Sequence, residues 1–187
     1  MSHSTLLDRV IATVDSSPHG VGSGRCTRHH AVQVPARKPL YSAAERARRD
    51  ATGWTMVQGL LAPFQFAVFL VSLSLVIIYL GTGEHLLATE ISIVIKTLTL
   101  YAIMVTGAVW EKKVFGRYLF APAFYWEDVF SMLVIALHTA YVYAFLADAG
   151  TPHFRMWLAL AAYAAYVINA TQFILKLRAA RLDTRSA

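Results

Sequence analysis

The sequence contains one cysteine, Cys26, among 187 residues. A single thiol cannot form a disulfide within the chain, and it cannot supply the several cysteine ligands of a zinc or iron–sulfur site. Charged residues are also scarce, because Asp, Glu, Lys and Arg make up 15% of the chain while hydrophobic residues make up 57%. This composition excludes an ordinary water-soluble globular domain, and it gives no indication of redox or metal-cluster chemistry.

Motifs for common cofactors and catalytic centres are missing as well. The sequence has no Gly-rich phosphate loop, no HExxH, no nucleophile elbow and no metal-ligand pair at short helical spacing. Its basic N-terminal region has no nucleic-acid-binding module. We therefore predict no nucleic-acid partner, and we expect the basic residues to meet anionic membrane lipid.

What the sequence does contain is long uncharged stretches. Residues 51–83 are 33 consecutive residues without Asp, Glu, Lys or Arg, and about 20 apolar residues are enough to cross a bilayer. Glu90 and Lys96 make the second candidate span the weakest prediction of the four, since no other predicted span contains a charged residue. We predict an all-α integral membrane protein, a four-helix transmembrane bundle. Its predicted spans are 59–80, 86–110, 129–147 and 156–175.

The first 50 residues differ from the rest in composition. They hold eight Lys or Arg against four acidic residues, together with three prolines and a Gly-rich run at 20–24. This pattern favours a flexible basic N-terminal tail, and its apolar stretches are too short for a cleaved export signal. Farther along, Ser42 and Glu45 have the spacing of a capping box, which predicts a short helix on the membrane surface.

Charge distribution predicts the orientation of the bundle. Four spans place both termini on one side of the membrane. That side would carry 15 Lys or Arg, whereas the other side would carry only Arg155. The positive-inside rule therefore predicts that both termini are cytoplasmic.

Polar residues within the spans fall into two layers when a rise of about 1.5 Å per residue is converted into depth. Lys96, His138 and Tyr166 are expected to share a central layer. A second, more polar layer lies nearer the cytoplasm. Its members are Gln65, Thr106, Glu127, Asp128, Ser131, Asn169 and Gln172.

One face of the third span carries an acid at its mouth and an imidazole near mid-depth, because Glu127, Ser131 and His138 fall within one helical arc. This face is either the wall of a pocket or a surface whose polar groups bond neighbouring helices. Lys96 has the same two interpretations, since it can line a substrate path, or it can pair with Glu90 or reach an interface.

The start of the third span also has two interpretations. Glu127 and Asp128 can act as helix caps, or one of them can be a proton donor beside Trp126. The aromatic loop before this span is either an interfacial belt or a platform for a ligand. Its aromatic residues are Phe115, Tyr118, Phe120, Phe124, Tyr125 and Trp126.

Four segments carry a resemblance to a known family. They read LAPFQF at 61–66, TGAVWEK at 106–112, FGRYLFAPAFYWEDVF at 115–130 and NATQF at 169–173. These segments closely resemble the 3-vinyl (older name 2-vinyl) bacteriochlorophyllide hydratase family, over residues 39–182. The resemblance implies a membrane hydratase domain at 39–187 and a basic extension at 1–38 that lies outside the family core.

The resemblance further implies a hydro-lyase of bacteriochlorophyll a synthesis. Such an enzyme hydrates the C3 vinyl group of chlorophyllide a, or of a bacteriochlorophyllide precursor, to a 1-hydroxyethyl group. It would lie in the bacterial inner membrane, cytoplasmic or intracytoplasmic. Its partners would be the tetrapyrrole substrate, membrane lipid and neighbouring pigment-synthesis enzymes. No cofactor and no protein-bound metal are expected, since the magnesium belongs to the pigment.

We assign roles from chemistry and position. An acid must protonate the terminal vinyl carbon, water must attack the carbon attached to the ring, and a base must then remove a proton. Glu127 or Asp128 is the predicted donor, and His138 is the predicted base or the ligand of the pigment magnesium. Lys112 and Arg117 are expected near the substrate propionate. The full set of predicted substrate-binding residues is Gln65, Lys112, Arg117, Trp126, Asn169 and Gln172.

Two other classes of protein are compatible with the same residues. A pigment-binding or assembly protein would use the aromatic bundle and His138, but it would bind pigment without turnover. A small transporter subunit would also contain Lys96 and His138 inside the membrane, but it would normally have internal symmetry or more than four spans.

Overall fold

The computed structural model describes residues 40–185, with side chains as far as residue 181, so the predicted extension at 1–38 lies outside the described residues. Within this range the secondary structure is entirely helical, as predicted, and contains no strand. The helices are α2 (Ala43–Ala51), α3 (Trp54–Thr82), α4 (Leu86–Phe115), α5 (Tyr125–Leu146) and α6 (Pro152–Arg185).

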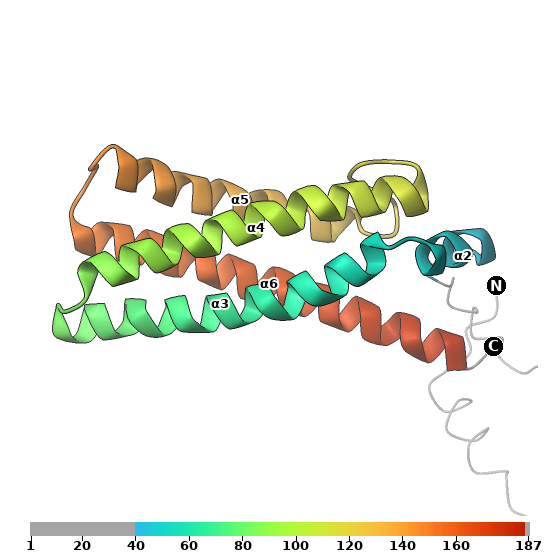
Figure 1. Cartoon of the computed structure of the whole chain (residues 1–187), viewed down its shortest axis with the longest axis horizontal. Helices are drawn as coiled ribbons and strands as arrows, with labels where there is room; N and C mark the ends of the chain where they lie inside the picture. Colours follow the sequence, from blue (N-terminus) through green and yellow to red (C-terminus); the bar gives the residue numbers. More distant parts are fainter. Residues whose placement is uncertain (1–39, 186–187) are drawn as a thin grey trace, which may run out of the picture. The chain divides into compact units, whose positions relative to one another are not determined.

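Four of these helices are long and apolar enough to cross a membrane, which confirms the four predicted spans. Each helix is longer than the span predicted for it. Consecutive long helices run antiparallel (Figure 1). We call one end of the bundle the α2 end, because it contains α2, the loop at 116–124 and the last turns of α6. The turns at 83–85 and 147–151 form the opposite end.

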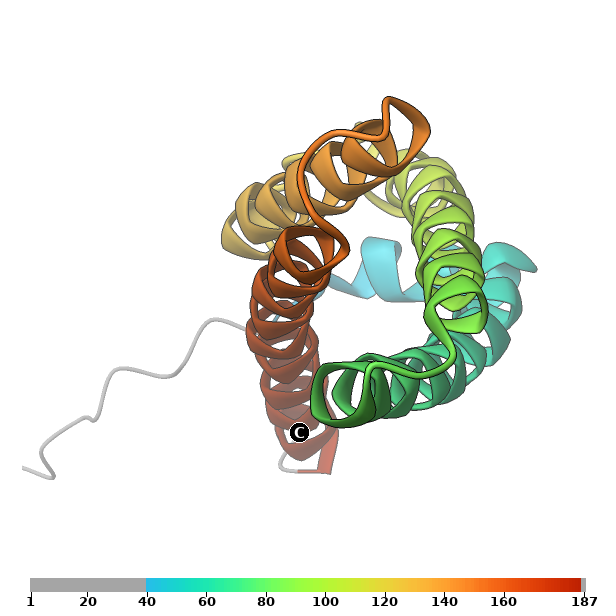
Figure 2. The same ribbon diagram turned by 90° about the vertical axis from the view of Figure 1, so that its left-hand side faces the viewer.

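The long helices are arranged as two hairpins. Helix α3 packs mainly against α4, and α5 packs mainly against α6. Smaller contacts between α4 and α5 and between α3 and α6 join the hairpins, so the four helices form a ring when viewed end-on (Figure 2). The groups that face the centre of this ring therefore come from all four helices.

The interior of the bundle is unusually polar, and its exterior is apolar. Ser72, Thr89, Lys96 and His138 are fully buried. Large apolar side chains point outward from every long helix, including Leu60, Ile77, Val105, Leu146 and Ile174. In water this distribution would be unfavourable, whereas in a bilayer the outer side chains meet lipid and the polar groups are shielded from it.

The helix ends have residues that suit their backbone conformation. The predicted capping box is confirmed, since the Glu45 N–H donates to Ser42 Oγ (3.3 Å) and the Ser42 N–H donates to Glu45 Oε2 (2.8 Å). Gly83 and Gly116 end α3 and α4 with φ values of +75° and +82°, a left-handed conformation that glycine adopts without steric cost. Gly116 thereby begins the loop that leads to α5.

Candidate active site

The central layer predicted from helix rise is confirmed. Lys96 Nζ of α4 lies 3.8 Å from the ring centroid of Tyr166 on α6, and His138 of α5 lies close enough to interact electrostatically with Lys96. The imidazole also packs against the Tyr163 ring, with the centroids 5.8 Å apart. Three helices thus bring their polar side chains together at this depth.

His138 has a defined tautomer. Its Nδ1 lies 2.8 Å from the Val134 carbonyl oxygen, one turn earlier in α5. A carbonyl only accepts, so Nδ1 carries the proton and Nε2 of the neutral ring carries a lone pair. Nε2 is buried without a hydrogen-bond partner among the described residues. His138 therefore does not link helices through a hydrogen bond, and its lone pair is available to a ligand.

Lys96 does not pair with Glu90, so that alternative interpretation was wrong. Glu90 instead binds Arg155 of α6, with Oε1 at 2.9 Å from Nη2 and 3.1 Å from Nε. Arg155 also forms an ion pair with the exposed side chain of Asp148. Lys96 does not reach an interface either, because it is fully buried and, within the described part of the chain, its Nζ has no hydrogen-bond partner.

Three predicted amides contribute further unpartnered atoms to the interior. Asn169 Nδ2 donates to Ser131 Oγ (2.8 Å), which leaves its Oδ1 without a partner. The Oε1 atoms of Gln65 and Gln172 are likewise buried and unpartnered. Buried polar atoms normally find hydrogen-bond partners. These oxygens are consequently candidates for binding water or polar substrate groups.

The two predicted acids at the start of α5 have different surroundings. Both are buried, with 6% of Glu127 and 2% of Asp128 exposed. Glu127 forms an ion pair with Lys176 of α6, whose Nζ also donates to the Ala123 carbonyl. Asp128 instead accepts a hydrogen bond from the Phe120 N–H at 2.7 Å. Glu127 is thus connected to α6 and Asp128 to the loop before α5. Both acids therefore make contacts beyond those of a helix cap.

Glu111, at the end of α4, is the residue that sequence reasoning missed. It is 6% exposed, and its Oε2 accepts from the Ala121 N–H at 3.4 Å. The carboxyl groups of Glu111 and Asp128 are hydrogen-bonded to each other. Two carboxyl groups can share a hydrogen bond only if one of them carries a proton. The buried pair can therefore hold a proton at the α2 end of the bundle.

The loop that holds this pair has an uncommon backbone. Phe120 adopts a positive φ of 58°, which is unusual for a bulky residue and is maintained only where surrounding contacts require it. Its N–H is the donor to Asp128, and the next N–H, of Ala121, is the donor to Glu111. Consecutive amides of the loop thus bind the two carboxyl groups.

The remaining predicted substrate-binding residues lie apart from the buried groups. Lys112 and Arg117 are exposed, and Lys112 Nζ donates to the Gly116 carbonyl at 3.0 Å. Trp126 is 66% exposed, with its ring edge-on to Tyr125. The structure therefore brings the predicted amides into the interior but leaves the two cations and the tryptophan on the surface.

The aromatic loop is divided in the same way. Phe115 and Phe124 pack with Tyr41 and Trp110 in a buried cluster, whereas Tyr118, Phe120, Tyr125 and Trp126 are exposed. Burial raises the pKa of the Tyr41 phenol, which keeps it protonated near neutral pH. This cluster fixes the segment before α2 against the ends of α4 and α5.

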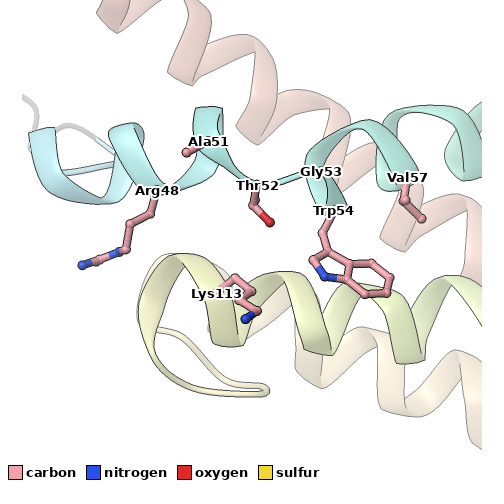
Figure 3. Close-up of a pocket in the computed structure, with 7 residues that line it drawn as sticks. All are labelled: Arg48, Ala51, Thr52, Gly53, Trp54, Val57 and Lys113. Carbon is pink, nitrogen blue, oxygen red and sulfur yellow. The ribbon is translucent and has the colours of Figure 1, made fainter.

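A surface pocket of about 590 Å³ lies at the junction of α2 and α3 (Figure 3). None of the predicted site residues lines it. Its two cationic side chains belong to Arg48, which also donates to the Val114 carbonyl at 2.7 Å, and to Lys113. The lining residues are Arg48, Ala51, Thr52, Gly53, Trp54, Val57 and Lys113.

Fold and site together define a multi-pass membrane protein. Its buried groups include a carboxyl pair that shares a hydrogen bond, an imidazole lone pair and amide oxygens, and such groups are suited to acid–base chemistry. Comparison with known sequences identifies the family. The chain belongs to the 2-vinyl bacteriochlorophyllide hydratase family, whose profile matches residues 41–179. The resemblance carried by the four sequence segments is thereby confirmed.

Two relatives support the same assignment, and both are named 2-vinyl bacteriochlorophyllide hydratase. The protein of Cereibacter sphaeroides is 65% identical over 155 residues, which cover 82% of this chain and 95% of the relative. The protein of Rhodobacter capsulatus is 64% identical over 155 residues, which cover 82% of this chain and 90% of the relative. No solved structure matches the chain.

Proposed function

We propose that this protein is a hydro-lyase of bacteriochlorophyll biosynthesis that converts the C3 vinyl group of chlorophyllide a, or of a related bacteriochlorophyllide precursor, into a 1-hydroxyethyl group. The observation that carries this proposal is the family match over residues 41–179, together with two relatives named for this hydratase at about 65% identity. The start of that match at residue 41 also supports a domain boundary near residue 38.

The reaction adds one water across a double bond. A proton adds to the terminal vinyl carbon, and the positive charge forms on the neighbouring carbon, where the conjugated macrocycle can delocalise it. Water attacks that carbon and then loses a proton to a base. The reaction releases as many protons as it consumes and involves no net oxidation or reduction, so it requires no nicotinamide or flavin. The magnesium belongs to the substrate.

Asp128 is the proton donor in this proposal, and Glu111 is its partner. The hydrogen bond between the two carboxyl groups requires a proton, whereas the ion pair between Glu127 and Lys176 requires an ionised carboxylate. After Asp128 has protonated the vinyl group, the pair has lost its proton and can accept one from the attacking water. The same two residues thereby return to their starting state.

His138 acts at a different part of the pigment. It lies ten residues after Asp128 on the same helix, which corresponds to about 15 Å along the axis. An acid and a base that act on adjacent carbons need to be much closer than this. Of the two predicted roles, the position of His138 therefore favours the magnesium ligand, with Nε2 supplying the lone pair.

The other predicted residues complete the proposed site. The buried oxygens of Gln65, Asn169 and Gln172 orient the attacking water and polar groups of the pigment. Lys112 and Arg117 are exposed at the α2 end, where they can meet the substrate propionate. Trp126 contacts the pigment or the lipid at that rim.

We place the protein in the bacterial inner membrane, cytoplasmic or intracytoplasmic, with the α2 end toward the cytoplasm. The excess of Lys and Arg on that side supports this orientation. α2 then lies at the membrane surface, where anionic lipid and neighbouring pigment-synthesis enzymes can reach it.

Topology reporters test this orientation. Reporters fused after Ala187 and inserted near Lys113 are expected to show a cytoplasmic location, and one inserted near Gly83 is expected to show a periplasmic location. The measurement is the activity of a paired cytoplasmic and periplasmic reporter at each site. A periplasmic signal near Lys113 would contradict the proposed orientation.

A reconstituted reaction tests the function itself. Purified protein in detergent, given chlorophyllide a and no nucleotide, reductant or metal, is expected to yield a product heavier by one water. Its red absorption band should move to shorter wavelength, because hydration removes a vinyl group from conjugation. In oxygen-18 water the label is expected in the hydroxyethyl group. Pigment that binds without acquiring label would identify a pigment-binding protein instead of a hydratase.

A further inference from the structure

Lys96 takes no part in the reaction steps above, yet it lies at the centre of the bundle. It is fully buried within a membrane-length helix, and its Nζ contacts the Tyr166 ring but has no hydrogen-bond partner among residues 40–181. Glu90 on the same helix is already bound to Arg155. Desolvating an ammonium group is costly unless it is paired, and ionisable groups inside membranes commonly line substrate paths.

The groups near Lys96 complement it chemically. His138 Nε2 carries a lone pair that no described residue binds, and Tyr141, one turn farther along α5, has a buried hydroxyl without a partner. Lys96 is a donor only, and Nε2 of the neutral His138 is an acceptor only. Together they match a ligand that presents both an electron-pair acceptor, such as a metal ion, and an oxygen that accepts a hydrogen bond.

We propose that Lys96 and His138 form a pigment-binding site at mid-depth, in which His138 Nε2 ligates the magnesium while Lys96 donates a hydrogen bond to an oxygen at the edge of the macrocycle. This inference rests on the proposed function, because it takes a chlorophyllide-type pigment as the ligand. The ketone oxygen of the fifth ring has the required chemistry and is the expected partner, because the propionate carboxylate is proposed to meet Lys112 and Arg117 at the α2 end.

The proposed site lies deeper in the bundle than the proton donor. Asp128 and His138 are separated by about 15 Å along α5. From a magnesium ion bound to His138, half of the macrocycle with its vinyl group can extend toward the α2 end, where Asp128 and Glu111 lie. Lys96 then fixes the rotation of the pigment about its magnesium, so that the vinyl group and no other substituent faces the acid.

Pigment titrations test the role of Lys96. Lys96→Met keeps the length of the side chain and removes its charge, and removal of an unpaired buried charge is not expected to destabilise the bundle. We expect this variant to bind chlorophyllide a at least about tenfold more weakly than the unmodified protein, as for loss of a charged hydrogen bond. Lys113→Met, an exposed change on the same helix, is the matched control and should bind as tightly as the unmodified protein.

Two modified pigments identify the oxygen. One is the propionate methyl ester of chlorophyllide a, and the other is its analogue without the fifth-ring ketone. The pigment that lacks the partner of Lys96 should bind equally to Lys96→Met and to the unmodified protein, whereas the other should still discriminate between them. A Mg-free pigment should bind more weakly than chlorophyllide a, and His138→Leu should abolish that difference.

Two results would overturn the proposed site. If Lys96→Met binds every pigment as tightly as the unmodified protein does, Lys96 only packs on Tyr166. If the variant loses the same affinity for all three pigments, no oxygen is recognised by Lys96. All titrations are made in an Asp128→Asn background, in which turnover is expected to be at least about 100-fold slower while pigment binding is retained, so the two proposals fail separately. Hydration without dependence of binding on Lys96 would refute the site alone, and selective binding without hydration would refute the hydratase alone.

Discussion

Asp128→Asn is expected to lower turnover at least about 100-fold while pigment binding is retained. A factor of about 100 is the lower end of what a positioned general acid contributes to the rate. The carboxamide has nearly the same shape and can still accept from the Phe120 N–H, but it cannot supply the proton that Asp128 shares with Glu111. The turnover number is measured from the absorption change on hydration, and binding is measured by pigment titration.

Glu127→Gln provides the matched control, because it makes the same chemical change at the adjacent residue. It removes the ion pair with Lys176 but leaves the pair formed by Glu111 and Asp128 intact, so its effect on turnover should be smaller than that of Asp128→Asn. Equal losses in the two variants would contradict the assignment of Asp128 over Glu127. Hydration at the unmodified rate in Asp128→Asn would place the donor elsewhere.

The second large effect is expected at the opposite end of the bundle and concerns stability. Arg155→Met removes the partner of the buried Glu90 carboxylate, and breaking a buried ion pair in this way should lower the free energy of unfolding by about 3 kcal/mol. The measurement is the midpoint of thermal unfolding in detergent.

Two further variants separate the buried ion pair from the exposed one. Asp148→Asn removes an ion-pair partner whose side chain is 93% exposed, so it should cost less than about 1 kcal/mol. The double variant Glu90→Leu with Arg155→Met removes both buried charges and should recover most of the loss. No recovery in the double variant would show that Arg155 stabilises the bundle through contacts other than Glu90.

The long helices could be predicted from the sequence because lipid imposes a simple requirement. A span must be long, apolar and internally hydrogen-bonded, and the uncharged stretches satisfy that condition. The fixed rise of a helix also placed Lys96, His138 and Tyr166 at one depth, which the contact between Lys96 and Tyr166 confirms. The capping box was equally local, since it depends only on Ser42 and Glu45.

The pairings between helices could not be predicted in this way. In a helix that is apolar on all sides, the sequence pattern does not distinguish the lipid-facing side from the interior. Glu90 and Arg155 are 65 positions apart, and only the closing of the four helices into a ring brings them together across its interior. The partnership of Glu111 and Asp128 similarly depends on the path of the intervening loop, including the positive φ of Phe120.

The hairpin arrangement has a consequence for how the protein matures. Helices α3 and α4 form one hairpin and α5 and α6 form the other, whereas Glu111 belongs to the first and Asp128 to the second. A hairpin is a natural unit of insertion, because its two antiparallel helices can enter the bilayer together. The carboxyl pair of Glu111 and Asp128 therefore forms only when the two inserted hairpins dock, which is a late step in the assembly of the newly made chain.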